Sequence, residues 1–148
     1  MKVIKASEKH VDPVAHLFDL YRQFYQCESD YELARQFIGD RIKNDESTIF
    51  VAQDTDDRLN GFVQLYPSYC SVEAIKIQIL YDLYVEAESR KRGVAEALMR
   101  RASAYAKETG AARVDLLTAK TNQAGQHLYE KLGYKIVNQD FHAYSLYP

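Results

Sequence analysis

The sequence predicts an α/β fold in which helices flank a mixed, mostly antiparallel central sheet. Two observations support this prediction. Strand-like and helix-like hydrophobic patterns alternate along the chain, and successive strand-like segments are joined in some places by short turns and in others by a helix. Strands joined by a short turn pair antiparallel, whereas strands joined by a helix pair parallel. The predicted order is one strand, two helices, three strands, a helix, a strand, a helix and two closing strands.

The first elements are a short strand and two helices. Residues 2–6 alternate in the manner of a short strand. Asp12 and Pro13 mark the start of a helix, because Asp caps a helix and Pro fits its first turn. Apolar residues spaced three and four apart extend this helix to about Gln26. The S-x-x-E pattern over 29–32 is a capping box that opens the second helix.

The remaining elements follow from the same periodicities. Two strand-like runs around the polar turn TDDRLN predict a hairpin, and a long β-rich run comes after it. Two later amphipathic segments predict helices that end at Gly110 and Gly133, since a glycine commonly closes a helix. The segments are strands over 48–53, 61–66, 75–85 and 114–117, helices over 94–107 and 124–132, and closing strands over about 134–138 and 141–146.

Composition predicts one globular domain and excludes several functions. A length of 148 residues without a Pro-, Gly- or Ser-rich linker predicts a single domain over 1–148. Hydrophobic residues at 47% and charged residues at 27% exclude a disordered chain. A net charge of −2 argues against electrostatic binding to nucleic acid or to a membrane surface. No apolar stretch approaches the ~18 residues of a membrane span and no signal peptide is visible, so we expect a cytoplasmic protein.

The cysteines and histidines form no pattern that binds a metal. Cys27 and Cys70 are far apart in sequence and belong to no Cys/His ligand motif. The four histidines also stand without partner carboxylates at metal-ligand spacing. We therefore expect no metal.

Residues 90–95, with the sequence RKRGVA, break a local rule. Three consecutive cations stand at the start of the predicted helix 94–107, where the helix dipole disfavours positive charge by ~0.3–1 kcal/mol each. A bound anion resolves the conflict, because backbone N–H groups at a helix start can hold it and Gly93 lets the backbone approach it. The alternative is a solvated basic turn with a glycine at the helix entry, and the loop alone does not decide between the two.

Two segments resemble the signatures of a known enzyme family. The segment YDLYVEAESRKRGVAEALM over 81–99 is similar to the central motif of the GNAT superfamily of N-acetyltransferases, in which a D-Φ-x-V strand leads into R/Q-x-x-G-x-G/A and a helix. The segment TNQAGQHLYEKLGYK over 121–135 resembles the second signature, an Asn that opens a helix carrying a Tyr. Asp82 is typical of the bacterial branch that resembles polyamine and histone-type acetyltransferases, and Ala95 stands where many members carry Gly. The predicted order of elements is also that of the GNAT (acyl-CoA N-acyltransferase) fold.

The resemblance implies acetyl-CoA as the cosubstrate and gives roles to particular residues. It implies that the backbone of the loop holds the pyrophosphate. The edge of the preceding strand would pair with the pantetheine arm, and a backbone N–H there would polarise the thioester carbonyl. Asn122 would contact the cosubstrate, and Tyr129 would protonate the leaving thiolate. The implied cofactor-binding residues are Leu83, Tyr84, Val85, Arg90, Lys91, Arg92, Gly93, Val94, Ala95, Asn122 and Tyr129.

Several of these residues also have plain structural interpretations. Tyr129 can be a core residue of a short helix, and Asn122 is a helix cap by local sequence alone. The acceptor amine needs a base, because only ~1 in 10³ amines with a pKa near 10.4 is neutral at pH 7. Asp82 is the candidate catalytic base, and the alternative is a structural carboxylate. Tyr81 alternates with Asp82 across the sheet, so we expect only one of the two to face the acceptor.

The predicted function is acetyl-CoA-dependent N-acetyl transfer to a primary amine, directly within a ternary complex. The acceptor would be a small cationic amine, an amino acid or a lysine side chain. Acidic residues interleaved with aromatic ones over 21–32 and 66–75 suit a cation, although acidic residues also suit a helix start. The alternative is a non-catalytic acetyl-CoA-binding or sensing module that acts through protein partners. Strand edges in FHAYSLY over 141–147 predict a homodimer.

Overall fold

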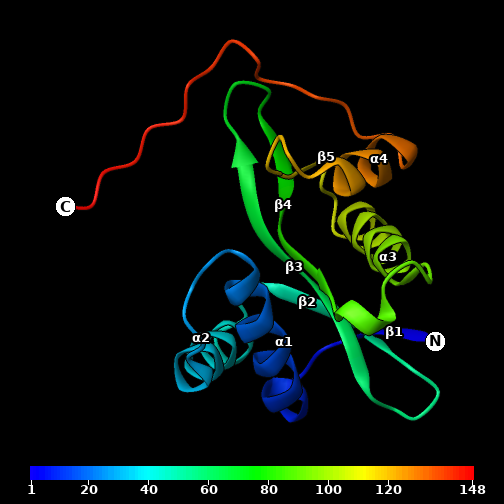
Figure 1. The fold of residues 1–148 in the computed structure, drawn as a ribbon. Coiled ribbons are helices and arrows are strands. Elements are labelled where there is room, and N and C mark those ends of the chain that lie inside the picture. Colours follow the sequence, from blue (N-terminus) through cyan, green and yellow to red (C-terminus); the bar gives the residue numbers. More distant parts are fainter. The chain divides into compact units, whose positions relative to one another are not determined.

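The computed structural model describes residues 1–148 and contains a five-stranded sheet and four α-helices (Figure 1). The chain divides into two compact units, Met1–Leu117 and Thr118–Pro148. No helix is long and apolar enough to cross a membrane. The strands are β1 (Lys2–Lys5), β2 (Thr48–Gln53), β3 (Leu59–Cys70), β4 (Ile75–Val85) and β5 (Arg113–Asp115), and the helices are α1 (Val11–Phe24), α2 (Tyr31–Lys43), α3 (Val94–Glu108) and α4 (Gln123–Lys131), with short 3-10 turns η1 (Glu8–His10) and η2 (Ala87–Ser89).

The strands of the first unit form one mixed sheet in the order β1-β2-β3-β4-β5. The first four pair antiparallel with their neighbours, whereas β5 pairs parallel with β4. The pair is parallel because α3 connects β4 to β5 and returns the chain to the end of the sheet at which β4 begins. The predicted α/β fold, with a mixed, mostly antiparallel sheet flanked by helices, is confirmed.

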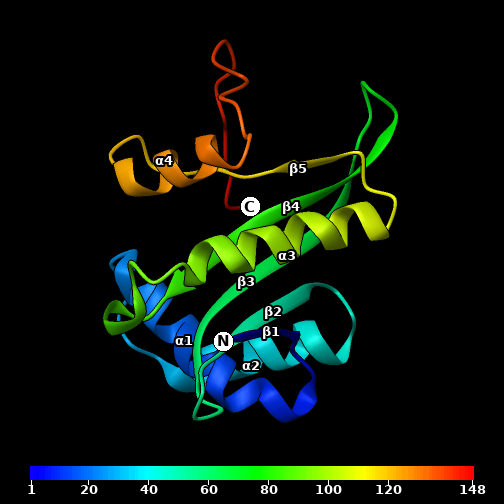
Figure 2. The same ribbon diagram turned by 90° about the vertical axis from the view of Figure 1, so that its right-hand side faces the viewer.

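Helices of the first unit cover both faces of this sheet (Figures 1 and 2). On one face α1 and α2 pack together, and the ring of Phe18 in α1 meets that of Phe62 in β3 edge to face, with centroids 6.3 Å apart. On the other face lies α3, where the rings of Tyr105 and Phe50 in β2 are 5.5 Å apart. Because both faces are covered, the side chains of β2 and of the first half of β3 are buried almost without a break.

A buried carboxylate joins α1 to the start of α2. Asp19 Oδ1 accepts a hydrogen bond from the backbone N–H of Asp30 at 2.8 Å, and Asp19 Oδ2 accepts one from Ser29 Oγ at 2.7 Å. Burial acts to raise the pKa of Asp19, but these hydrogen bonds outweigh it and lower the pKa. Asp30 caps α2 by accepting from the Leu33 N–H at 3.1 Å. The capping box predicted over 29–32 is therefore wrong, because Asp19 takes up the Ser29 hydroxyl.

The second unit contains α4 and a C-terminal segment. Asn122 caps α4, since its Oδ1 accepts from the Gly125 N–H at 3.1 Å, and this predicted cap is confirmed. Residues 134–148 contain no strand, so the closing strands predicted over 134–138 and 141–146 are absent. An alternating pattern shows that a segment suits a strand, but a strand also requires a neighbour that completes its hydrogen bonds.

Candidate active site

The last part of β4 has an edge without a strand beside it. β3 pairs with β4 along its whole length, but β5 pairs only with Ile77, Gln78 and Ile79. From Leu80 to Val85 the β4 edge on the β5 side therefore has no ladder partner. An extended ligand can hydrogen-bond to such an edge in the way a further strand does. This edge includes the backbone of residues 83–85, which the resemblance assigns to the pantetheine arm.

The loop after β4 has the backbone shape of an anion-binding turn. Lys91 and Gly93 have φ angles of 62° and 80°, both in the left-handed region. Gly93 is the N-cap of α3 and offers no side-chain acceptor to the N–H groups of the first helical turn, which begins with Val94 and Ala95. A Cβ atom added to Gly93 would meet no atom within 4 Å, so the space over the loop is open. Such a turn at a helix start presents backbone N–H donors to an anion, which fits a pyrophosphate.

The three cations of the loop do not act alike. Lys91 and Arg92 are exposed at the surface, where they can neutralise an anion. Arg90 turns back toward the strand, because its Nε donates a hydrogen bond to the Val85 carbonyl oxygen at 2.9 Å. The Arg90 guanidinium also lies 5.5 Å from the centroid of the Tyr84 ring, within cation–π range. Its side chain therefore fastens the loop to the end of β4.

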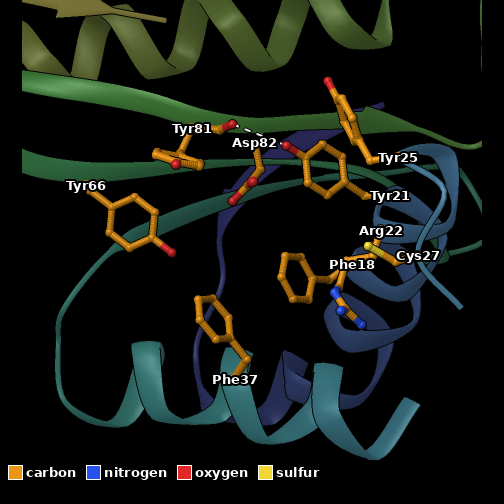
Figure 3. A pocket seen from close by; sticks show the side chains of 9 residues that line it. All are labelled: Phe18, Tyr21, Arg22, Tyr25, Cys27, Phe37, Tyr66, Tyr81 and Asp82. Carbon is orange, nitrogen blue, oxygen red and sulfur yellow. Dashed lines mark hydrogen bonds between the residues drawn. The ribbon is translucent and has the colours of Figure 1, made fainter. Parts of the chain in front are cut away.

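A β-bulge places Tyr81 and Asp82 on the same face of the sheet. In the pairing of β3 with β4, Gln64 lies opposite Asp82 and Leu65 lies opposite Leu80, so Tyr81 is an extra residue. Tyr81 and Asp82 both line one cavity beside α1 (Figure 3). The expected alternation of Tyr81 and Asp82 across the sheet is wrong, because the bulge interrupts it, and which of them faces the acceptor stays a prediction.

This cavity has a volume of about 280 Å³ and is lined by residues of α1, α2, β3, β4 and the α1–α2 loop. Aromatic rings form most of its wall, and Phe18 and Phe37 stack there with ring centroids 5.3 Å apart. An acid, Asp82, and a guanidinium, Arg22, are the two residues of the wall that ordinarily carry charge. The lining residues are Phe18, Tyr21, Arg22, Tyr25, Cys27, Phe37, Tyr66, Tyr81 and Asp82 (Figure 3).

A chain of buried hydrogen bonds holds Asp82 in place. Gln64 Nε2 donates to Asp82 Oδ2 at 2.6 Å, and Ser47 Oγ donates to Gln64 Oε1 at 2.7 Å. Gln64 is fully buried, and Ser47 and Asp82 are exposed by only 7% and 4%, so water does not compete for these bonds. The Tyr21 hydroxyl reaches both the Tyr81 carbonyl oxygen, at 3.3 Å, and the Asp82 carboxylate, and its one hydrogen serves one acceptor at a time.

The cavity shifts the protonation of its own side chains. Burial raises the pKa of Asp82, while the hydrogen bonds from Gln64 and Tyr21 act in the opposite direction without cancelling it. Burial and the nearby charge of Asp82 raise the pKa of Tyr66 to about 12 and also raise that of Tyr21. Both phenols therefore keep their protons at neutral pH. A carboxyl group with a raised pKa has a stronger conjugate base, so Asp82 is suited to accept a proton from a ligand.

Two of the predicted site residues belong to the second unit. Asn122 caps α4 and also donates from Nδ2 to Thr118 Oγ1 at 3.0 Å. Tyr129 lies on α4, with its ring centroid 6.2 Å from that of Tyr134. The roles of Asn122 and Tyr129 toward acetyl-CoA stay predictions.

Sequence reasoning missed part of the cavity wall. Arg22 and Phe18 lie one helical turn apart on α1, with Tyr21 and Tyr25 at matching spacings, so the helical period contained a signal for this face. Gln64 gave no such signal, since only the strand register brings it opposite Asp82. No group of three or more His, Cys, Asp or Glu side chains is placed to hold a metal ion.

The acidic residues weighed for a cationic acceptor lie elsewhere. Glu28, Asp30 and Glu32 are exposed and do not line the cavity. Asp30 instead caps α2, in agreement with the alternative explanation that acidic residues in this segment serve the start of a helix. The aromatic residues of these segments agree more closely with the expectation, because Tyr21, Tyr25 and Tyr66 do line the cavity.

Comparison with known proteins agrees with this geometry. Residues 14–134 match the family described as Acetyltransferase (GNAT) family. The chain belongs to the GNAT family of acetyltransferases. The matched range includes the bulged strand β4, the loop over 90–95 and α4, so it contains the first segment that resembles a GNAT signature and all of the second except Lys135. The protein is therefore a transferase, and its family transfers acetyl groups.

Individual relatives of this GNAT protein extend over nearly its whole length. It is 36% identical over 135 residues to the uncharacterized N-acetyltransferase YhfO of Bacillus subtilis, covering 91% of this chain and 90% of that one. The chain is also similar to a protein whose crystal structure is described as that of a probable acetyltransferase. The two are 38% identical, with a TM-score of 0.90, and the match covers 100% of this chain and 98% of the other. The ribosomal-protein-alanine N-acetyltransferase of Brucella melitensis biovar Abortus 2308 shares the GNAT fold, with a TM-score of 0.78 at 19% identity over 99% of both chains.

Proposed function

We propose that this protein transfers an acetyl group from acetyl-CoA directly to the nitrogen of a primary amine within a ternary complex. The observation that carries the proposal is the position of Asp82, a buried carboxylate in the wall of an aromatic cavity. Asp82 lies on β4, the strand whose edge from Leu80 to Val85 has no ladder partner. A proton acceptor and a backbone edge that suits the acetyl donor are thus neighbours on one strand.

The residues after Asp82 fit acetyl-CoA. The backbone edge over 83–85 would pair with the pantetheine arm, and a backbone N–H of this edge would polarise the thioester carbonyl. The open turn at Gly93 and the first N–H groups of α3 would hold the pyrophosphate, with Lys91 and Arg92 neutralising its charge. Acetyl-CoA supplies the acetyl group as a thioester, whose C–S bond breaks as the C–N bond to the amine forms.

Asp82 would remove the proton that blocks the amine. An alkylamine with a pKa near 10.4 is ~99.9% protonated at pH 7, and its lone pair is then unavailable. Transfer of that proton to Asp82 Oδ frees the lone pair for attack, and Gln64 keeps the accepting carboxylate in position. Aromatic rings around the cavity would hold the ammonium group by cation–π contact before the transfer.

Tyr129 is the proposed donor to the leaving thiolate, on the strength of the family resemblance. A thiol titrates near 8.5 and a tyrosine near 10, so full transfer from Tyr to thiolate is uphill by about 2 kcal/mol. This cost is small enough for a strong hydrogen bond, or a transfer tuned by the site, to assist departure of the thiolate.

Calorimetric titration with acetyl-CoA tests the donor site. Wild-type protein should bind, and a Gly93→Glu variant should not, because the new carboxylate would stand where the pyrophosphate is held. Gly110→Glu is the matched control, since Gly110 has the same φ of 80° and equally open surroundings at the far end of α3. Equal binding by both variants would contradict the loop assignment.

Turnover tests the reaction itself. Thiol release from acetyl-CoA is followed with a panel of polyamines, lysine peptides and amino acids, in the wild type and in Asp82→Asn. The proposal expects acetylation of at least one amine class and a loss of about 10²-fold or more in Asp82→Asn. Binding of acetyl-CoA without turnover of any amine would instead support the non-catalytic sensing module.

A further inference from the structure

The wall of the cavity that contains Asp82 also contains a cation that forms no salt bridge. Arg22 lies on α1 one turn after Phe18, and both residues line the cavity (Figure 3). No carboxylate forms a salt bridge with Arg22, and its Nη1 is buried without a hydrogen-bond partner. Asp19 on the same helix is near enough for the charge of Arg22 to help lower its pKa, but it forms no salt bridge with Arg22, and its oxygens accept from Ser29, Asp30 and Gln23.

Arg22 differs in this respect from the other arginines. Outside the loop over 90–92, every other arginine pairs with a carboxylate, in each case away from the cavity lining. These paired residues are Arg35, Arg41, Arg58, Arg100, Arg101 and Arg113. A guanidinium left unpaired at the wall of an apolar cavity is costly, and a ligand that brings an anionic group would offset that cost.

We propose that the acceptor is an amine that also carries a carboxylate, with the carboxylate bound by Arg22 and the amine directed to Asp82. This inference rests on the proposed function and narrows its acceptor class. The two charged residues of the wall have opposite signs, so a zwitterionic acceptor pairs with both of them. Phe18, Phe37 and Tyr66 form an apolar wall, which suits an acceptor with an aromatic or aliphatic body.

The same charges act against the other acceptor classes. A polyamine carries only positive charge, so it would bring a second cation next to Arg22. A lysine side chain within a peptide offers its ammonium group to Asp82 but has no carboxylate of its own to pair with Arg22. Amino acids and related amino carboxylates are the class that satisfies both ends of the cavity.

Matched pairs of acceptors test the inference. Acetylation of phenylalanine is compared with that of phenethylamine and phenylalaninamide, and acetylation of 4-aminobutyrate with that of butylamine. The wild type should show a kcat/KM about 10- to 100-fold higher for the carboxylate-bearing member of at least one pair, the range expected for a charge-assisted hydrogen bond. The pair that responds reports the spacing between amine and carboxylate.

Variants then tie the preference to Arg22. Arg22→Gln should lower kcat/KM for the carboxylate acceptor by about the same factor, so that its preference over the decarboxylated amine is lost. Arg22→Lys, which keeps the charge, should retain part of the preference. Arg35→Gln is the control, because Arg35 is an exposed arginine that pairs with Asp12 and does not line the cavity.

The possible failures are distinguishable. If the wild type acetylates the decarboxylated amines or polyamines as well as the amino carboxylates, the inference is overturned while the proposed function stands. An unchanged preference in Arg22→Gln would also overturn it. If no amine is acetylated although acetyl-CoA binds, the proposed function fails, and the inference falls with it.

Discussion

Gln64 and Asp82 face each other across the paired strands β3 and β4 and share a hydrogen bond of 2.6 Å in which the amide of Gln64 donates to the carboxylate. Both side chains are almost completely buried. A buried carboxylate with one firm donor is held in a fixed orientation yet keeps a raised pKa. This combination suits a base that must be both aimed and strong.

Replacement of Gln64 by Leu should move the pH dependence of the reaction. The Gln64 hydrogen bond stabilises the ionised form of Asp82, so its loss raises the pKa of Asp82 further. The acidic limb of the kcat/KM profile should therefore shift to higher pH, because the base must be ionised to act. Gln78→Leu is a matched control, since Gln78 is also a buried glutamine of this sheet but its Oε1 has no partner. An unshifted acidic limb in Gln64→Leu would argue that Asp82 is not the titrating base.

Asp82→Asn should stabilise the fold while it lowers activity by about 10²-fold or more. Because the pKa of Asp82 is raised in the folded state, the folded protein binds this proton more tightly than the unfolded chain. Ionisation therefore costs stability as pH rises from the ordinary pKa of Asp, near 3.9, through the raised value, and the cost persists above it. The variant should gain about 1.4 kcal/mol in free energy of unfolding at pH 7 for each unit of that rise.

Urea denaturation at pH 7 and at pH 3.5 measures this effect. The gain of Asp82→Asn over the wild type should be present at pH 7 and should vanish below the ordinary pKa of Asp, where both chains are neutral at this position. Asp56→Asn, at an exposed position of the β2–β3 turn, should change stability by less than about 0.5 kcal/mol. A variant less stable than the wild type at pH 7 would contradict the prediction.

Tyr129→Phe should slow turnover without weakening the binding of acetyl-CoA. The variant keeps the ring and loses only the hydroxyl that is proposed to serve the leaving thiolate, so kcat should fall by about 10²-fold. Tyr134→Phe is the control from the same unit, because the Tyr134 hydroxyl is buried without a hydrogen-bond partner. Equal rates in the wild type and in Tyr129→Phe would remove Tyr129 from the mechanism.

We propose that two copies of the chain associate through the C-terminal segment. Phe141 and Tyr144 are exposed by 77% and 91%, and apolar side chains at such exposure gain free energy when a partner covers them. Analytical ultracentrifugation should give twice the monomer mass of 17.1 kDa. A double variant, Phe141→Ser with Tyr144→Ser, should sediment as a monomer, while Tyr69→Ser, a change of a tyrosine on β3 that is exposed by 75%, should not alter the mass. A monomeric wild type would contradict the proposal.

Most of the fold could be predicted because its elements have local causes. The spacing of apolar residues along α1 and the glycine at the start of α3 are properties of a few neighbouring residues. The closing strands could not be predicted in the same way, because an alternating pattern does not contain the partner that a strand requires. The local sequence around Asn122 was enough to predict that it caps α4. Its role toward acetyl-CoA could not be predicted from the local sequence and comes from the family resemblance.

The candidate site was predictable only where it depends on the strand and the loop. Asp82 was singled out by its place at the end of the strand predicted over 75–85 and by its match to the D-Φ-x-V motif of the resemblance. Its partner Gln64 was not, since a register between distant strands decides which residues meet. The joint orientation of Tyr81 and Asp82 escaped prediction for the same reason, because a bulge is a property of a strand pair and not of one segment.

The bulge at Tyr81 has a consequence for how such a site can arise. Without Tyr81, Leu80 and Asp82 would be consecutive residues that still pair with Leu65 and Gln64, so the extra residue leaves the pairing on both sides of it intact. The backbone carbonyl of Tyr81, which lies outside that regular ladder, accepts the Tyr21 hydroxyl of α1. A single inserted codon could thus add a side chain to the reactive face of a finished sheet while every other strand contact kept its partner.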